Sequence, residues 1–312
     1  MYTRDNYREA KAEIEARRTS AVALAEERCR ELATASPEIK RIDEELRGTG
    51  LELFRVACSG GDISAVRKRN EALIAARRAE LVRLGLPEDY TEVKYACPIC
   101  SDTGFVGTKM CSCLKELLIT KNIKSSGMGK LIERQSFENF SLEGIEGEDR
   151  ERMEKNLAKA KAYAELFPKC RGNLLLIGTT GTGKTHISTA IAKEIIHQGF
   201  DVVYDSVQNI ISDFESDKFK SNYGQGESLS EKYLECELLI IDDLGTEFST
   251  QFSTSTLYNL LNTRQNRGLA TIISTNLSAK ELAGKYDGRI YSRIVGSDYT
   301  VLFFSGKDYR IR

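Results

Sequence analysis

The spacing of apolar residues divides the chain into a helical first part and a second part in which strands and helices alternate. Residues 1–94 are rich in Ala, Glu, Arg and Leu, and apolar residues such as Val66, Leu73 and Leu81 recur close to helical spacing. Turn-forming residues separate the expected helices at Ser36-Pro37, Gly48-Thr49-Gly50, Gly60-Gly61 and Gly85-Leu86-Pro87. We therefore expect a small α-helical domain with a charged, solvated face. Narrow apolar stripes on such helices also suit docking to a partner.

From residue 135 to the end, short apolar runs of strand length alternate with helical stretches. The runs are 173–177, 201–204, 238–241, 270–274 and 299–304. This alternation predicts an α/β domain over residues 135–312, with a parallel sheet that carries helices on both faces. Residues 121–134, which contain Ser125-Ser126-Gly127 and Gly129, are expected to form a linker before this domain.

The composition is that of an ordinary soluble protein. Of the 312 residues, 41% are hydrophobic and 29% are charged, and the formal net charge is −1. Without an overall positive charge, any contact with DNA depends on a local basic patch or on several subunits acting together. No apolar run approaches the ~20 residues that a membrane span needs, and the N-terminus lacks the apolar core of a signal peptide. We therefore expect a cytoplasmic protein that does not contact a membrane.

The strongest motif is a complete match to the phosphate loop G-x4-G-K-[ST]. It reads Gly178-Thr179-Thr180-Gly181-Thr182-Gly183-Lys184-Thr185, and an apolar strand precedes it. A helix is expected after it, from Ile187 to His197. The glycines let backbone N–H groups surround a phosphate at the N-terminus of that helix. We expect Lys184 to reach the β- and γ-phosphates of ATP and Thr185 to ligate Mg2+, with His186 also among the nucleotide-binding residues.

A second motif ends the apolar run 238–241 with two acidic residues, Asp242 and Asp243. A buried strand of this kind delivers carboxylates to the edge of a parallel sheet where ligands bind. We expect Asp242 to hold Mg2+, mostly through water, and Asp243 to orient or deprotonate the attacking water. Many P-loop ATPases carry Glu at the second position, so the shorter Asp243 leaves the rate of hydrolysis open.

Two further polar features follow in the chain. The run 270–274 leads into Thr275-Asn276, where P-loop ATPases of the ASCE type carry a sensor residue near the γ-phosphate; Asn276 is the first candidate and Thr275 the second. Arg289 and Arg293 lie four residues apart and so share one face of a helix. An arginine on such a face suits insertion toward the γ-phosphate of a neighbouring subunit, although a surface pair remains the alternative.

The cysteines point to a metal site. Four of the eight lie close together as C-x2-C-x10-C-x-C, namely Cys97, Cys100, Cys111 and Cys113. In a chain without an export signal, clustered cysteines favour metal binding over disulfides. Four thiolates complete a tetrahedral zinc site, so residues 95–120 are expected to be a small four-cysteine zinc-binding module. An iron–sulfur cluster and unliganded thiols remain alternatives.

Together these residues resemble the DnaC/DnaI family of AAA+ helicase loaders and the related IstB transposition helpers. The resemblance covers roughly residue 137 to the end. It rests on Ser136-Phe137-Glu138-Asn139-Phe140, the phosphate loop, Ile240-Ile241-Asp242-Asp243-Leu244-Gly245, Ile273-Ser274-Thr275-Asn276 and Ser292-Arg293-Ile294. It implies an AAA+ P-loop ATPase domain without a C-terminal helical lid, since the chain ends soon after Arg293. It also implies that Phe137 and Phe140 lie near the adenine and that Arg293, rather than Arg289, is the arginine finger.

The resemblance also implies a function, the ATP-dependent loading of a hexameric replicative DNA helicase. Residues 1–94 would be the partner-binding domain, while the ATPase domains would self-associate through the ATP interface and hold single-stranded DNA. Basic candidates for that DNA contact are Lys218, Lys220, Arg264 and Arg267. DnaI-type loaders resemble this plan, with a zinc-containing N-terminal domain before the ATPase. IstB-type helpers generally lack such a cysteine module, which favours the loader.

Three other functions stay open at this point. The protein could be an IstB-like transposition helper that marks target DNA for a transposase. It could be a nucleotide-gated scaffold with little hydrolysis, which the short side chain of Asp243 would permit. It could also be a zinc-dependent DNA-binding module with an auxiliary ATPase, although the nearly balanced charge of the first 120 residues argues against this.

Overall fold

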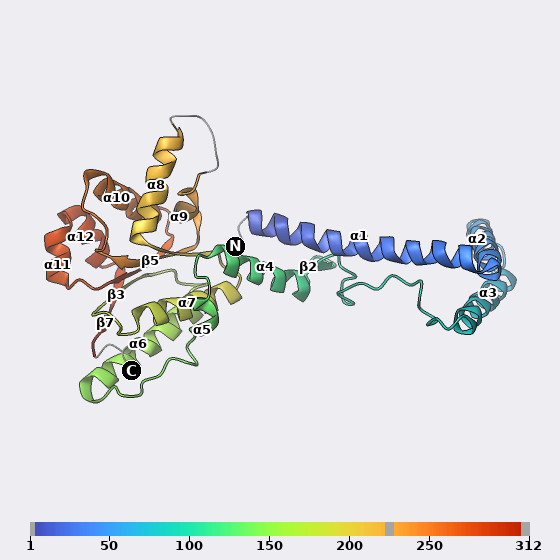
Figure 1. The fold of residues 1–312 in the computed structure, drawn as a ribbon, viewed down its shortest axis with the longest axis horizontal. Helices are drawn as coiled ribbons and strands as arrows, with labels where there is room; N and C mark the ends of the chain where they lie inside the picture. Colours follow the sequence, from blue (N-terminus) through green and yellow to red (C-terminus); the bar gives the residue numbers. More distant parts are fainter. Residues whose placement is uncertain (1–3, 222–227, 307–312) are drawn as a thin grey trace. The chain divides into compact units, whose positions relative to one another are not determined.

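The computed structural model describes residues 4–221 and 228–306 (Figure 1). The chain divides into two compact units. One unit is Lys11–Leu114, and the other consists of the described residues before and after it. No helix in the described part of the chain is both long and apolar enough to cross a membrane.

The first unit contains most of α1 (Arg4–Ala35) and all of α2 (Pro37–Cys58) and α3 (Ser64–Arg83). The break at Ser36-Pro37 is confirmed, because the Ser36 hydroxyl accepts a hydrogen bond from the backbone N–H of Ile39 and Pro37 is the first residue of α2. Between the helices, Leu32, Ile39 and Leu81 form a small buried cluster. The helical first part predicted by the apolar spacing is therefore present.

The expected break at Gly48-Thr49-Gly50 is wrong, because α2 continues through it. Thr49 is buried, its hydroxyl donates to the carbonyl of Leu46, and it accepts a hydrogen bond from the Asn70 amide of α3 at 2.8 Å. Packing of α2 on α3 thus outweighs the low helix propensity of two glycines, roughly 1 kcal/mol each. An ion pair between Arg77 and Asp43, at 2.7 Å, joins the same two helices.

The second unit is built on a parallel sheet of five described strands, in the order β4-β5-β6-β3-β7. The strands are β3 (Asn173–Gly178), β4 (Val202–Ser206), β5 (Leu238–Leu244), β6 (Ala270–Thr275) and β7 (Tyr299–Phe304), so all five predicted strands are present. Strand β6 lies between the strand that enters the phosphate loop and the strand that carries Asp242. This order brings the carboxyl ends of β3, β5 and β6 to one edge of the sheet.

Helices cover both faces of the sheet, as predicted (Figure 1). Along β3, Leu174 and Leu176 belong to one core cluster, while Leu175 and Ile177 belong to the other. The first cluster is completed by α5 (Leu131–Arg134), α6 (Gly147–Leu166) and α7 (Lys184–His197). The second is completed by α8 (Val207–Ser221), α9 (Glu231–Glu235), α10 (Gln251–Asn266), α11 (Ala279–Lys285) and α12 (Gly288–Val295).

Residues 121–134 differ from the linker expected there. Helix α4 (Ser112–Ser125) runs into this stretch, and the segment after it packs on the sheet. Met128 is buried in the first core cluster, and the backbone N–H of Tyr204 in β4 donates to the carbonyl of Ser126 at 2.7 Å. The Ser-Gly composition therefore marks a tight turn along the sheet edge rather than a free connection.

Arg264 is a buried structural residue, so its candidacy for DNA contact is wrong. Its side chain has no exposed area. The guanidinium donates to the backbone carbonyls of Tyr233, Cys236 and Ala270, at 2.8, 3.0 and 2.5 Å, and to the Thr271 hydroxyl at 3.1 Å. Arg264 thus joins α9, α10 and β6 by satisfying carbonyls that would otherwise be buried without partners.

We expect Arg264→Lys to lower the free energy of unfolding by about 2–4 kcal/mol, because an ammonium cannot reach carbonyls spread across the guanidinium fork. Urea unfolding measures the change. Arg267→Lys is the matched control, since Arg267 is exposed and its guanidinium donates one described hydrogen bond, to the carbonyl of Leu234 at 3.2 Å. Equal effects of the two substitutions would contradict a structural role for Arg264.

A second buried charge makes stability depend on pH. Asp201 precedes β4 and is 8% exposed. Burial raises the pKa of Asp201 from 3.8 to about 6, although the positive charge of Arg264 opposes the shift. The folded protein therefore binds this proton more tightly than the unfolded chain does. As the pH rises from the pKa of Asp201 in the unfolded chain to its pKa in the folded protein, the stability contributed by the neutral acid is lost. Above the folded pKa, the buried carboxylate is charged and the full cost of burying that charge lowers the free energy of unfolding.

We expect Asp201→Asn to raise the free energy of unfolding by up to about 3 kcal/mol near neutral pH, because the amide keeps the shape of the side chain without its charge. At about pH 4 the same substitution should have a much smaller effect. Urea unfolding at the two pH values gives the comparison. A stability difference that is the same at both would show that ionisation of Asp201 is not its cause.

Candidate nucleotide site and thiol cluster

The phosphate loop joins the end of β3 to the start of α7. Gly178 closes β3 beside β7, where a Cβ atom would lie 2.1 Å from the carbonyl oxygen of Phe304. Gly183 caps α7 with a φ of 94°, and a Cβ there would meet the ring of Phe140 at 3.0 Å. Both positions therefore require glycine. The loop places the N-terminus of a 14-residue helix at the carboxyl edge of the sheet, as a phosphate site requires.

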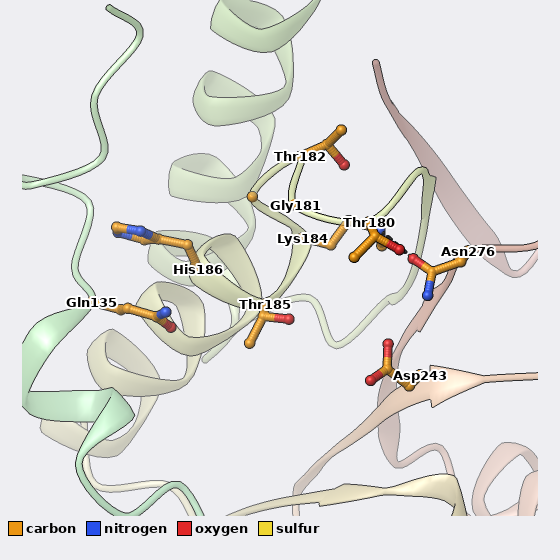
Figure 2. A pocket seen from close by; sticks show the side chains of 10 residues that line it. Gln135, Thr180, Gly181, Thr182, Lys184, Thr185, His186, Asp243 and Asn276 are labelled. Atoms are coloured by element: carbon orange, nitrogen blue, oxygen red, sulfur yellow. Dashed lines mark hydrogen bonds between the residues drawn. The ribbon is translucent and has the colours of Figure 1, made fainter. Parts of the chain in front are cut away.

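A pocket of about 260 Å³ opens above this loop (Figure 2). Its lining includes the phosphate loop together with residues from β5 and from the segment after β6. The lining residues are Gln135, Thr180, Gly181, Thr182, Gly183, Lys184, Thr185, His186, Asp243 and Asn276. The structure thus brings together the predicted loop, the second acid and the first sensor candidate, which are distant in sequence.

Lys184 is tied to both sides of the pocket. Its ammonium group donates to the carbonyls of Gly178 and Thr179, each at 2.7 Å. It also donates to the side-chain oxygen of Asn276 at 2.8 Å (Figure 2). Lys184 is 6% exposed. Asn276 therefore contacts the phosphate-loop lysine directly, whereas Thr275 is buried and donates to the carbonyl of Leu244 at 2.7 Å.

Asp242 is buried next to the phosphate loop, and its carboxylate is surrounded by hydroxyl groups. Tyr204 of β4 and Ser274 of β6 donate to its two oxygens, and Thr185 donates to one of them at 3.4 Å. Asp242 is 8% exposed, so these donors replace water around its charge. Burial, together with the adjacent carboxylate of Asp242, raises the pKa of Tyr204 well above its usual range, so its hydroxyl keeps its proton.

The side chain of Asp243 points in a different direction from that of Asp242 because the backbone of β5 departs from regular strand geometry at Asp243. Its φ is 54°, in the left-handed region, and the register with β6 shifts between Ile241 and Leu244. The backbone N–H of Asp243 donates to the Ser274 hydroxyl at 3.1 Å. As a result Asp243 is exposed and lines the pocket, while Asp242 stays buried.

The two phenylalanines of the lead-in segment have different environments. Phe140 meets the edge of His186 with ring centroids 5.0 Å apart and lines a space of about 220 Å³ beside the phosphate loop. Phe137 is buried in the first core cluster and does not line either space. His186 is fixed by contacts from its Nε2 to the carbonyl of Ser136 and the side-chain oxygen of Asn139, at 2.9 and 3.0 Å.

Three residues at the site were not predicted from the sequence to be site residues. Gln135 lines the pocket, and its buried side-chain oxygen has no hydrogen-bond partner among the described residues. Tyr204 and Ser274 hold Asp242, but in the sequence they are ordinary members of apolar strands. A signal exists only in the sheet register: Asp242 and Ser274 each lie two residues beyond the aligned pair Ile240 and Ile272.

The arginine pair lies on α12. Arg289 is exposed, whereas Arg293 is half-buried against α10. Its guanidinium lies 4.5 Å from the ring centroid of Tyr258 and donates to the side-chain oxygen of Asn262 at 2.8 Å. The buried Nε of Arg293 has no hydrogen-bond partner among the described residues.

Of the remaining basic candidates for DNA contact, two lie at the surface and one has a side chain outside the described residues. Lys218 lies over the ring of Phe252 at 5.0 Å, and Arg267 is exposed. The side chain of Lys220 lies outside the described residues.

The four clustered cysteines form a compact thiol set in the first unit. All four sulfur atoms lie within 4.8 Å of one another, with Cys97 and Cys111 3.8 Å apart and Cys100 and Cys113 3.5 Å apart. Tetrahedral zinc with Zn–S bonds of ~2.3 Å requires sulfur atoms ~3.8 Å apart. The donor set and its spacing therefore fit a zinc ion.

Backbone groups around the thiols support the same site. Asp102 has a φ of 52°, and its carboxylate accepts hydrogen bonds from the backbone N–H groups of Ala96 and Cys97, at 2.8 and 2.9 Å. Burial opposes ionisation of Cys100. Hydrogen bonds from the Gly104 N–H and from the other thiols outweigh burial and lower the pKa of Cys100 to about 6. The short strands β1 (Phe105–Val106) and β2 (Lys109–Met110) pair between the two cysteine pairs.

Comparison with known proteins identifies the family. Residues 120–289 match the family of IstB-like ATP binding proteins, which is more than half of the chain. The protein belongs to this family. The matched span contains the phosphate loop, both acids of β5 and Asn276. Together with the strand order, family membership confirms the predicted AAA+ P-loop fold.

Curated relatives extend the similarity to proteins of replication. The chain is 25% identical to the replicative helicase loader DnaC of Escherichia coli (strain K12) over 198 residues, which are 64% of this chain and 78% of the relative. It is 25% identical to the replicative helicase loader DnaC of Buchnera aphidicola subsp. Baizongia pistaciae (strain Bp) over 196 residues, 63% of this chain and 77% of the relative. A crystal structure of the DnaC helicase loader superposes with a TM-score of 0.49 at 20% identity, covering 57% of this chain and all of that one.

We expect the purified protein to carry one zinc ion and Cys100→Ser to weaken zinc binding at least about tenfold, because three thiolates leave the tetrahedral site open. Elemental analysis and competition with a chromogenic chelator measure both quantities. Cys58→Ser is the matched control, since Cys58 is an exposed cysteine outside the cluster. Iron with visible absorbance, or zinc retained equally by both variants, would contradict the zinc site.

Proposed function

We propose that this protein is an ATP-dependent loader of a replicative DNA helicase. The observation that carries the proposal is the similarity to the replicative helicase loader DnaC of Escherichia coli over 198 residues. The helical unit with its four-cysteine cluster, placed before the ATPase, supports a loader over a transposition helper. The family's description as IstB-like keeps the transposition helper as the second candidate.

ATP would occupy the pocket above the phosphate loop. Backbone N–H groups from Gly178 to Thr185 and the ammonium of Lys184 would hold its phosphates, while Phe140 and His186 would border the base. Gln135 offers an acceptor oxygen without a partner among the described residues, which suits the amino group of adenine. Thr185 and Asp242 would hold Mg2+. When bound, Mg2+ neutralises charge on the phosphates.

Hydrolysis would depend on groups at the carboxyl edge of the sheet. Asp243 is exposed in the pocket and would orient or deprotonate water. Asn276, which contacts Lys184 at 2.8 Å, would align the γ-phosphate with that water. The side chain of Asp is shorter than that of Glu, which would permit slow turnover.

Assembly would complete the site between subunits. In this proposal the ATPase units self-associate, and Arg293 of one subunit reaches the γ-phosphate held by the next. Tyr258 and Asn262 would fix the guanidinium for that role. The assembly would also bind single-stranded DNA, with Lys218 and Arg267 as surface candidates.

The helical unit would dock on the hexameric helicase. On α2, Leu51 and Phe54 are 71% and 72% exposed and lie three residues apart, so they share one face of the helix. Exposed apolar side chains at this spacing are typical of helix-mediated docking.

We expect the full-length double variant Leu51→Glu and Phe54→Glu to bind the replicative helicase of the same organism at least about tenfold more weakly, because charge replaces two apolar anchors. Binding of a fluorescent ATP analogue should not change. Co-purification and titration with zinc and ATP present give both values.

Phe248→Glu is the control for that experiment, since Phe248 is 87% exposed but lies in the ATPase unit. Wild-type protein that fails to bind the helicase, yet binds a transposase of the same organism, would replace the loader with the transposition helper. ATP binding without measurable turnover in the wild type would favour the nucleotide-gated scaffold.

A further inference from the structure

The buried carboxylate of Asp242 is held from both neighbouring strands. Tyr204 of β4 donates to one oxygen and Ser274 of β6 to the other. The even-numbered apolar residues of these strands, such as Val202, Ile240 and Ile272, belong to the core cluster under α7. Tyr204, Asp242 and Ser274 continue that pattern, so all three face the helix that begins with the phosphate-loop lysine. The Tyr204 hydroxyl thus sets where a carboxylate oxygen lies beneath the loop.

The backbone of Tyr204 is fixed in turn by the segment after α4. Its N–H donates to the carbonyl of Ser126 at 2.7 Å. Its carbonyl faces Gly127, where an added Cβ would lie 2.3 Å from the oxygen and the φ is 81°. A side chain at this position would therefore be strained and would have to displace the carbonyl of Tyr204. Strand β4 is at the edge of the sheet, so this turn occupies its outer side.

The turn itself is anchored in the core. Ser126 and Asn122 are fully or almost fully buried, and Met128 is 2% exposed. The Ser126 hydroxyl donates to the carbonyl of Ile123 at 2.8 Å, and the Asn122 amide accepts a hydrogen bond from Asn6 of α1 at 2.7 Å. The position of Tyr204 therefore depends on a segment outside the nucleotide motifs.

We propose that Tyr204 is a positioning residue for the metal-binding carboxylate Asp242, and that the Ser126-Gly127 turn sets the place of Tyr204. The inference rests on the proposed function, because it requires Asp242 to serve Mg2+ in an ATP site. A tyrosine with only a packing role would contribute its ring to the core, and Tyr204→Phe would then leave metal binding unchanged.

Titration of Mg2+ into full-length protein with a fluorescent ATP analogue tests the proposal. For Tyr204→Phe, the Mg2+ concentration that gives half-maximal enhancement of nucleotide binding should rise about 10- to 100-fold. Affinity for the analogue in excess chelator should not change, because the loop N–H groups and Lys184 are untouched. The thermal unfolding midpoint reports whether the ring still packs.

A pair of glycine variants tests the turn without altering the site. Gly127→Ala should raise the required Mg2+ concentration as Tyr204→Phe does, because the methyl group displaces the carbonyl of Tyr204. Gly129→Ala is the matched control: Gly129 also has a positive φ, of 51°, but a Cβ there meets nothing within 4 Å. Backbone strain is thus similar in both variants, while the contact with Tyr204 exists in one.

The outcomes separate the inference from the proposed function. Wild-type protein without Mg2+-dependent nucleotide binding would overturn the proposed function and the inference with it. Mg2+-dependent binding in the wild type that is unchanged in Tyr204→Phe would overturn the inference alone. Equal Mg2+ requirements in Gly127→Ala and Gly129→Ala would overturn the part of the inference in which the Ser126-Gly127 turn sets the place of Tyr204.

Discussion

A buried carboxylate needs hydrogen-bond donors around it, and this requirement organises the centre of the ATPase unit. Asp242 receives hydrogen bonds from Tyr204, Ser274 and Thr185, which lie on β4, β6 and α7. These elements must therefore lie side by side in the fold for the charge to be stable. The strand order satisfies that condition, since β5 lies between β4 and β6 and the phosphate loop begins one strand further on. The same strand order brings Lys184, Asp243 and Asn276 together at the carboxyl edge of the sheet.

The residues that belong to recognisable patterns were predicted from the sequence. Apolar runs of strand length indicated all five strands, and the phosphate loop with the acids of β5 indicated which edge of the sheet carries the site. The sequence placed Asn276 near the γ-phosphate, and the structure adds its direct contact with Lys184, which follows from the pairing of β3 with β6. Such features depend on local chemistry and on the rule that carboxyl ends of parallel strands share an edge.

Other features depend on tertiary contacts and left no pattern in the sequence. Tyr204 and Ser274 lie within apolar runs of strand length, and only the folded structure brings their hydroxyl groups to Asp242. Arg264 has the charge of a surface residue near a helix end, yet the carbonyls around it require a buried guanidinium. Gly48 and Gly50 predict a break, but the buried Thr49 between them keeps α2 continuous. In each case packing outweighed a local preference.

The left-handed backbone of Asp243 has a consequence for the evolution of this chain. A φ of 54° costs an aspartate roughly 1 kcal/mol or more, and glycine would adopt the same conformation without strain. Selection for a more stable protein would therefore favour losing the acid that faces the pocket. In the proposed function, this aspartate exchanges stability for a carboxylate that acts on the attacking water. Ancestral or stabilised versions of the domain that carry glycine there would keep the fold and lose the acid.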